Sequence, residues 1–352
     1  MSQDILSDLL RTVHLRGALF YYVSGGECWA AQAPPSREIA ASVMPESEHV
    51  LEYHVVTRGS CWGAIVGHAP VRLEAGDVIL FPQGDAHVIS SAPDVRGVAH
   101  VPGPGPRTEQ LPFSLHLDAV EARPGDGGEG CATTLACGFL GCDVRPFNPL
   151  VATLPRLLHL RASEERDWIG QFVHLAVRES RNKRPGGEAM LERMSEMMFV
   201  DAVRRYVDTL PEGSAGWLAG LRDRFVGRAL ALMHEDPAAQ WTVDDLGRRV
   251  GLSRSALHER FAGMIGQPPM QYLASWRMQV AAGLLRNTHS TVAAIAQEVG
   301  YESEAAFAKA FKRLVGSPPA AWRREATLRA QALRAKKDER LNPADIPPSA
   351  RT

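Results

Sequence analysis

The residues between Trp241 and Trp322 contain one pattern twice, and this internal repeat constrains the fold more than any other feature of the chain. The first copy reads WTVDDLGRRVGLSRSALHERFAGMIGQPPMQYL and the second reads STVAAIAQEVGYESEAAFAKAFKRLVGSPPAAW. Each copy has apolar residues at i, i+3 and i+7, then a glycine, then an apolar pair at i and i+4. Because glycine readily takes the positive φ that ends a helix, the spacing predicts two short helices joined by a tight turn. Such a unit is a helix-turn-helix, which indicates DNA binding.

Hydroxyl side chains stand where the predicted helices should begin. Thr242 and Thr291 are placed to cap the first helix of each copy, and Ser253 and Ser303 to cap the second. An α-solenoid is the alternative for a helical repeat. Solenoids need several copies to bury their faces, and only two are present, so we favour paired helix-turn-helix units.

The segment between the copies, PPMQYLASWRMQVAAGLLRNTHS, also favours a helix. Roughly 20 residues at 1.5 Å each span about 30 Å. One turn of B-DNA measures about 34 Å. The chain could therefore reach two successive major grooves.

Residues 221–324 closely resemble the DNA-binding domain of the AraC/XylS family of bacterial transcription regulators, on the runs GYESEAAFAKAFKR (300–313) and GSPPAAWR (316–323). The resemblance covers about a third of the chain and implies that the second helix of each unit enters the major groove. It also implies RNA polymerase as a partner and activation as the sign of regulation. The implied reading positions are Arg254, Ser255, His258 and Glu259 in the first copy, and Glu304, Ala305, Ala308 and Lys309 in the second.

The side chains at these positions differ in what they can read. Arginine or lysine can pair with guanine, a carboxylate can accept from cytosine N4, and alanine can touch only a thymine methyl group. We therefore expect the second helix to be the poorer reader. Lys312 and Arg313 stand where phosphate contact is more expected than base reading, with a solvated helix face as the alternative.

Length and composition fit a regulator built of separate domains. A chain of 352 residues with 45% hydrophobic content indicates two or three domains with real cores. We find no apolar run of 18 residues and no signal peptide at the N-terminus, so we expect a cytoplasmic protein without a membrane segment. The net charge is −8 for residues 1–216, +4 for 217–325 and +3 for 326–352, which confines basic character to the part that would meet phosphates.

The first 180 residues contain short runs of β type, LEYHVV (51–56), CWGAIV (61–66) and DVILFP (77–82), separated by turn residues. The segment GDVILFPQGDAHVIS resembles the second cupin motif, and Glu52 precedes Gly59 as at the end of the first motif. The positions that carry the second motif are Gly76, Pro82, Gly84 and His87. The resemblance implies a cupin-like jelly roll. The predicted fold class is multidomain α+β, with this barrel preceding an all-α domain of two helix-turn-helix motifs.

The cupin resemblance is incomplete at its metal site. Metal-dependent cupins place two histidines before that glutamate, whereas the stretch PESEH offers only His49, off register. Glu52 and His54 share one strand face, and with His87 and Cys61 they could form an irregular effector or metal site. The alternative is that both histidines are packed residues with backbone partners. We expect no cofactor, and a cupin-type metal-dependent enzyme fused to a DNA-binding domain is the less favoured function.

The chain has five cysteines, an odd count that argues against a disulfide framework in a cytosolic protein. The spacings of Cys131, Cys137 and Cys142 match no zinc motif. We expect buried small hydrophobes, with redox sensing by Cys137 or Cys142 as an open alternative.

We therefore expect a sensor domain at residues 1–180, a helical connector at 188–212, the DNA-binding domain at 217–325 and a largely disordered tail at 326–352. The connector carries a Met-rich stripe, which could serve as core or as a homodimer surface. The predicted function is sequence-specific binding of promoter DNA under the control of a small-molecule or redox effector. A DNA-binding protein of low specificity is the other alternative.

Overall fold

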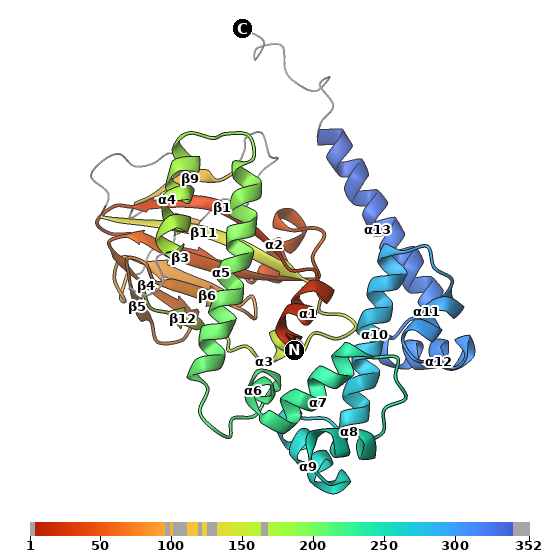
Figure 1. Cartoon of the computed structure of the whole chain (residues 1–352). Helices are drawn as coiled ribbons and strands as arrows, with labels where there is room; N and C mark the ends of the chain where they lie inside the picture. Colours follow the sequence, from red (N-terminus) through yellow and green to blue (C-terminus); the bar gives the residue numbers. More distant parts are fainter. Residues whose placement is uncertain are drawn as a thin grey trace.

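The structure is a computed structural model that describes residues 4–95, 99–100, 111–118, 122–124, 132–162 and 168–340. These residues form a sheet-rich N-terminal domain and a helical C-terminal domain, which lie side by side (Figure 1). The predicted fold class is confirmed, because the strands precede residue 161 and the two helix-turn-helix units follow residue 240.

Two sheets build the N-terminal domain in the described part of the chain. The larger has the order β10 (Ala122–Pro124), β9 (Phe113–Leu117), β1 (Arg16–Gly25), β11 (Thr133–Cys142), β3 (His49–Arg58), β6 (Val78–Phe81) and β12 (Leu158–Leu160). The smaller has the order β5 (Val71–Glu74), β4 (Ser60–Ile65), β7 (His87–Ser90), β2 (Ala30–Ala33) and β8 (Ala99–His100). Three of these strands, β3, β4 and β6, are the β-type runs expected from the sequence.

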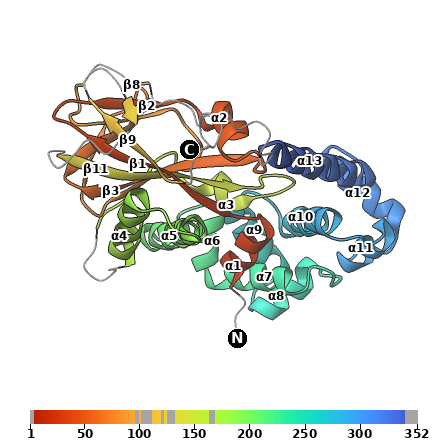
Figure 2. The same cartoon turned by 90° about the horizontal axis from the view of Figure 1, so that it is seen from above.

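The larger sheet is the middle layer of this domain. Its inner face packs against the smaller sheet through apolar residues such as Val56, Ile79 and Leu135. Its outer face is covered by the helices α4 (Trp168–Arg181) and α5 (Gly187–Thr209) (Figure 2). Because both faces are covered, all four residues of β6 are buried rather than alternating.

The segment expected to be a connector is helix α5, which packs along β1. Met198 points inward and is buried, whereas Met190 and Met197 are 52% and 48% exposed. The Met-rich stripe is therefore divided between the core and the surface. Two further helices, α1 (Ile5–Thr12) and α2 (Ser36–Val43), flank the sheets, and the short α3 (Pro149–Thr153) follows β11.

The C-terminal domain is helical throughout its described length. It contains α6 (Trp217–Arg222), α7 (Arg224–Glu235), α8 (Val243–Val250), α9 (Arg254–Ile265), α10 (Pro269–Asn287), α11 (Val292–Glu298), α12 (Glu304–Val315) and α13 (Pro319–Arg340). The first helix-turn-helix unit is α8–α9, the second is α11–α12, and α10 joins them.

The four hydroxyl caps expected from the sequence are present. Thr242 and Thr291 accept hydrogen bonds from the third residue of α8 and α11, and Ser253 and Ser303 do the same for α9 and α12. Gly251 ends α8 with a φ of 83°. Both turns therefore form for the local reasons that the sequence indicates.

The two units differ in how their apolar cores connect to the rest of the molecule. Leu246, Leu257 and Phe261 of the first unit belong to one continuous cluster with α1, α3 and α5 of the N-terminal domain. Phe307 and Phe311 of the second unit belong to a separate cluster with α10, α11 and α13. The first unit thus shares a core with the N-terminal domain, and the second does not.

The expectation of a largely disordered tail from residue 326 is wrong for residues 326–340, which continue α13. That segment is rich in Ala, Arg and Lys, which are strong helix formers, so it needs no apolar stripe to extend a helix already begun. The remainder of the expected tail lies outside the described residues. None of the helices in the described ranges has the length and apolar character needed to cross a membrane.

Candidate nucleic-acid interface and candidate effector site

The helices α9 and α12 each bury one side and expose the other. Leu257 and Phe261 of α9, like Phe307 and Phe311 of α12, are fully buried against the rest of their unit. The predicted reading positions lie on the opposite side. Those that are exposed are Arg254, Ser255, His258, Glu259, Glu304, Ala305 and Lys309.

Arg254 stands in the first turn of α9 with 72% of its side chain exposed. Within the described part of the chain, Arg254 forms one loose ion pair, with Nη1 lying 3.5 Å from a carboxylate oxygen of Asp244. An exposed pair of this kind contributes about 0–1 kcal/mol. The guanidinium group is therefore available to an incoming base edge.

The second helix presents fewer polar groups. Ala305 and Ala308 offer only methyl groups, and Ala308 is half-buried. Lys312 and Arg313 are exposed in the last turn of α12, at its far end from the Ser303 cap. Helix α12 thus offers fewer polar groups for base reading than α9, and phosphate contact by its C-terminal turn stays a prediction.

Several other arginines of this domain have structural partners. Arg260 is bound to Asp223 through its Nε and Nη2 atoms, which ties α9 to the cap of α7. Arg277 donates to the carbonyl oxygens of Pro237 and Ala239. These contacts remove Arg260 and Arg277 from the set of candidate phosphate ligands.

The N-terminal domain contains a cavity of about 300 Å³ between its two sheets. Its wall is mainly apolar and aromatic and comes from β1, β2, β3, β7, β9 and β11. The polar and aromatic side chains of the wall include Tyr21, Trp29, Glu52, His54, His87 and Cys137. The volume lies at the small end of ligand pockets, which measure about 300–1,000 Å³.

Three of the four residues expected to form an effector or metal site meet in this wall. Glu52, His54 and His87 offer ligand atoms that all lie within 4.8 Å of one another. Nε2 of His54 lies 2.8 Å from Nε2 of His87, which in turn lies 3.6 Å from Oε2 of Glu52. Cys61 is not part of this cluster, because it packs into the apolar core between the sheets.

The hydrogen bonds assign the tautomers of the two histidines. Nδ1 of His87 lies 3.0 Å from the carbonyl oxygen of Asp85, so it must carry the proton. Nε2 of a neutral His87 is then an acceptor, and Nε2 of His54 donates to it. Nδ1 of His54 is left as a bare acceptor, and it is buried without a partner among the described residues.

Burial keeps this cluster neutral. Desolvation raises the pKa of Glu52 from 4.5 to about 8, partly opposed by a hydrogen bond from Ser36. Desolvation likewise lowers the pKa of His87 to about 4 and that of His54 well below its ordinary value. Near pH 7 the cluster is therefore a protonated carboxyl group beside two neutral imidazoles.

Three cysteines of the N-terminal domain, Cys61, Cys137 and Cys142, are unfavourably placed for oxidation. Burial raises the pKa of the Cys61 and Cys142 thiols to about 12, and that of Cys137 well above its ordinary value. The thiolate is the reactive form, and burial suppresses it at all three positions. Cys28 is exposed, and Cys131 lies outside the described residues.

Sequence reasoning did not identify the aromatic wall of the cavity. Tyr21 and Trp29 come from β1 and the segment before β2, whereas Phe139 comes from β11, more than a hundred residues later in the chain. No local motif marks them, because only the pairing of β1 with β11 and of β2 with β7 brings them to one place. Nε2 of His49, the off-register histidine, donates to the carbonyl oxygen of Pro82, and His49 does not line the cavity.

Comparison with known proteins places both domains in described families. Residues 4–208 match the cupin family, and residues 246–325 match the helix-turn-helix domain family. An AraC-like transcription regulator of Streptomyces lividans is 32% identical over 93% of this chain and 98% of its own length. The regulator AlkR of Acinetobacter baylyi is 26% identical over 92% of this chain and 99% of its own length. The RCS-specific activator RclR of Escherichia coli is 26% identical over 78% of this chain and 84% of its own length. The chain therefore belongs to the AraC-type transcription regulators, in the group whose N-terminal domain is a cupin.

Proposed function

We propose that this regulator reads promoter DNA with the exposed faces of α9 and α12, and that a signal bound in the cavity between the two sheets controls it. The DNA-binding function itself follows from the family. We assign base reading mainly to the α9 positions, led by Arg254, and weaker base reading to α12. Lys312 and Arg313 are assigned to phosphate contact.

One observation carries this assignment. The two helix-turn-helix units, each with a capped second helix that buries an apolar side and exposes a polar side, are joined by the single helix α10, which has 19 residues. At 1.5 Å for each residue, α10 is about 28 Å long, close to the distance between successive major grooves on one face of DNA. This length supports binding of two half-sites by one chain.

The test is selection of a DNA site from a random pool by the full-length protein, followed by comparison of the selected duplex with random duplex. A specific regulator should bind the selected site at least 10³-fold more tightly, at a stated salt concentration. Equal affinity for the two duplexes would favour the alternative of a low-specificity DNA-binding protein.

The sign of regulation and the further partners are part of the proposal. We propose activation through contact with RNA polymerase in the cytoplasm, supported by the relative that is named an activator. Transcription of a selected promoter in a purified system, with and without the regulator, measures the sign. A fall in transcript would make the protein a repressor.

A homodimer through α5 also stays a proposal. Met190 and Met197 give the outer side of this helix an apolar surface, which could meet a second copy. The mass of the protein in solution, measured for the natural chain and for Met190→Gln with Met197→Gln, tests it. Two monomeric species would remove α5 as a dimer surface.

The family supports a protein without a catalytic role, and we propose none. A metal-dependent activity would require the Glu52, His54 and His87 cluster to hold an ion and turn over a substrate. Stoichiometric metal with turnover by the full-length protein would restore the cupin-type enzyme as the function.

A further inference from the structure

The cavity between the sheets has a chemistry that restricts what it can hold. None of its described lining residues is a lysine or an arginine, and Glu52 is the only acid among them. An anionic ligand would therefore be buried without a counter-charge, which costs several kcal/mol. Most of the remaining wall consists of aliphatic and aromatic side chains, so the favourable contacts are apolar.

Two polar atoms of the wall lack a hydrogen-bond partner within the described part of the chain. They are Nδ1 of His54, which is an acceptor in the assigned tautomer, and Nε1 of Trp29, which can only donate. Both are buried side-chain atoms, and buried polar atoms are almost always hydrogen-bonded. Nε1 of Trp29 lies against Gly25, so Nδ1 of His54 is the acceptor that the hydroxyl group of a ligand can serve.

A metal ion is the competing occupant, and the geometry is less favourable to it. The Nε2 atoms of His54 and His87 lie 2.8 Å apart and are hydrogen-bonded to each other. Both nitrogens that would coordinate a metal ion are therefore already engaged. In a tetrahedral zinc site each nitrogen lies about 2.0–2.1 Å from the ion, so two such nitrogens are farther apart than the 2.8 Å between these Nε2 atoms. The only carboxyl group of the cluster also accepts a hydrogen bond from Ser36.

We propose that the effector is an uncharged, mainly apolar small molecule with a hydroxyl group that donates to Nδ1 of His54. This proposal rests on the proposed function, because it names the signal for the same cavity.

The experiment uses probes that share one alkyl chain and differ in their head group: 1-octanol, octanoate and octylammonium, with Zn²⁺ as a fourth. Binding to the full-length protein is measured by calorimetry and by the thermal unfolding midpoint at pH 7. We expect saturable binding of 1-octanol, at least tenfold tighter than that of either charged probe. His54→Leu should weaken octanol binding about tenfold, whereas the exposed control His68→Leu should not change it.

Three results would overturn the proposal. They are equal or tighter binding of a charged probe, octanol binding unchanged by His54→Leu, and Zn²⁺ binding that requires Glu52 and His54 while octanol does not bind. The same protein preparation is tested on the selected DNA site. Loss of specific DNA binding there would count against the proposed function and leave the ligand result standing.

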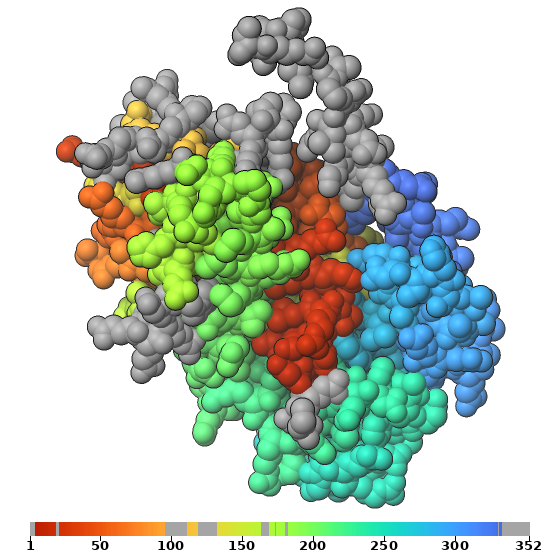
Figure 3. Space-filling model, turned by 45° about the horizontal axis from the view of Figure 1, so that its top comes forward, coloured from red at the N-terminus to blue at the C-terminus, as the bar shows by residue number. Residues whose placement is uncertain are grey.

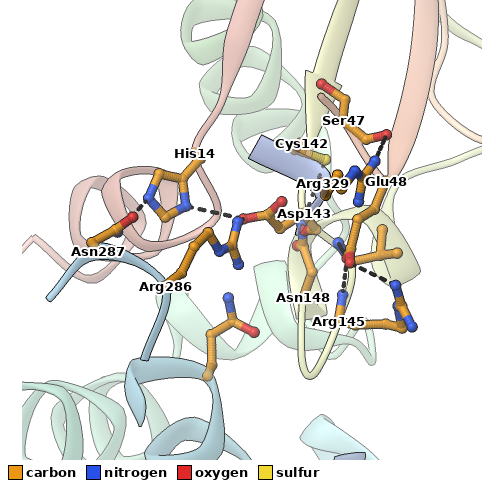
Figure 4. A network of polar contacts seen from close by, with 12 residues as sticks. His14, Ser47, Glu48, Cys142, Asp143, Arg145, Asn148, Arg286, Asn287 and Arg329 are labelled. Carbon is orange, nitrogen blue, oxygen red and sulfur yellow. Dashed lines mark hydrogen bonds and ion pairs between the residues drawn. The ribbon is translucent and has the colours of Figure 1, made fainter. Parts of the chain in front are cut away.

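A second observation, independent of the cavity, concerns how the second helix-turn-helix unit is attached. Its apolar cluster, which includes residues of α10 and α13, is separate from that of the N-terminal domain, and polar side chains of α10 and α13 contact that domain. Asp143, just after β11, is buried and lies 2.5 Å from Nη1 of Arg286 on α10 and 3.0 Å from Nδ1 of His14 (Figure 4). Nε2 of His14 in turn lies 3.1 Å from the Asn287 amide.

The electrostatics agree with a formed ion pair at this place. Burial alone would raise the pKa of Asp143, but the hydrogen bonds from His14 and Arg286 hold it below its ordinary value. Helix α1 contacts α7 and α10, and Figure 3 shows the N-terminal residues (red) between the green helices of the N-terminal domain and the blue helices of the C-terminal domain. Gln279 of α10 adds a further bond, accepting from the backbone N–H of Phe147.

A second group of contacts holds α13. Nη2 of Arg329 donates to the carbonyl oxygens of Pro45 and Ser47, in the loop before β3. The guanidinium group of Arg145, which pairs with Glu48, lies 5.6 Å from the ring of Trp322. These contacts come from the loops at the ends of β3 and β11.

Those two strands also carry Glu52, His54 and Cys137 of the cavity wall. A change at the cavity therefore has a short physical route to the second unit. We infer that the contacts of Asp143 and Arg329 form a clasp that holds the second helix-turn-helix unit against the N-terminal domain, whereas the first unit is fixed by its shared apolar core.

Hydrogen exchange of the full-length protein tests the clasp with the variants Asp143→Asn and Arg329→Gln, singly and together. We expect at least tenfold faster exchange in residues 45–48, 143–148 and the first turns of α13, with α8 and α9 unchanged. Arg193→Gln, which breaks an exposed pair on α5, is the matched control. Unchanged exchange in the double variant, or an equal rise in α8–α9 and α11–α12, would show that the polar contacts do not hold the second unit separately.

Discussion

At the scale of single residues, Arg254 and Lys312 separate base reading from phosphate contact. Arg254 is exposed in the first turn of α9, so it can form two hydrogen bonds to one guanine. We expect Arg254→Ala to cost about 1–3 kcal/mol on the selected site and little on random duplex. Lys312→Ala should weaken both and lower the salt slope by about one unit.

Affinity for both duplexes over a series of salt concentrations measures both effects. An equal loss on the two duplexes would reassign Arg254 to phosphate contact. An unchanged salt slope for Lys312→Ala would place that lysine outside the interface.

Glu52 gives the folded protein a distinctive pH dependence. Burial raises its pKa from 4.5 to about 8, so the folded form holds a proton that the unfolded chain releases. Its contribution to stability is therefore full below pH 4.5 and is lost as the pH rises to about 8, with a slope approaching 1.4 kcal/mol for each pH unit.

Glu52→Gln keeps the shape of the side chain and removes this titration. We expect the free energy of unfolding of the natural protein to fall relative to that of Glu52→Gln between pH 5 and pH 8. Urea unfolding of both proteins at several pH values measures the difference between their free energies of unfolding. His87 titrates in the opposite direction, but it is present in both proteins, so its contribution to the difference largely cancels. Parallel curves would mean that Glu52 ionises with an ordinary pKa.

At the scale of elements, the two recognition helices depend on their serine caps. Oγ of Ser303 accepts from the backbone N–H of Ala306, and Oγ of Ser253 accepts from that of Ala256. Loss of such a cap costs about 0.5–2 kcal/mol. Because the second unit has a separate core, we expect Ser303→Ala to speed hydrogen exchange in α11–α12 and not in α8–α9. Ser253→Ala is the matched variant, and an identical exchange pattern for both would contradict separate cores.

The helix-turn-helix elements could be predicted from the sequence because their causes are local. A serine or threonine begins each helix, a glycine ends α8, and the apolar spacing fixes the buried side. The strands β3, β4 and β6 could be predicted for the same reason. The extent of α13 could not be predicted from apolar periodicity, because helix propensity rather than burial accounts for it beyond residue 325.

The candidate effector site was only partly predictable. Glu52 and His54 share a strand face, which the two-residue period of a strand gives directly. His87 joins them through the packing of β7 against the larger sheet, and the cupin resemblance supplied that position. The expected place of Cys61 beside them depended on tertiary packing, which places it in the apolar core instead.

At the scale of the whole molecule, we expect the signal to be a ligand rather than an oxidant. Desolvation keeps the thiols of Cys61, Cys137 and Cys142 protonated, so hydrogen peroxide should not change the affinity of the folded protein for its selected site through these three cysteines. A variant with all five cysteines changed to serine should respond to the effector as the natural protein does. A peroxide effect that a thiol reductant reverses, and that the variant lacks, would make oxidation the signal.

The central claim is that one chain reads two major grooves through the fixed spacing that α10 provides. The most direct measurement is the affinity of the full-length protein for its selected site with five or ten base pairs inserted between the half-sites. We predict that both insertions reduce affinity to that of a single half-site, because ten base pairs restore the face of the DNA but add about 34 Å that α10 cannot span. Full affinity after either insertion would contradict the claim.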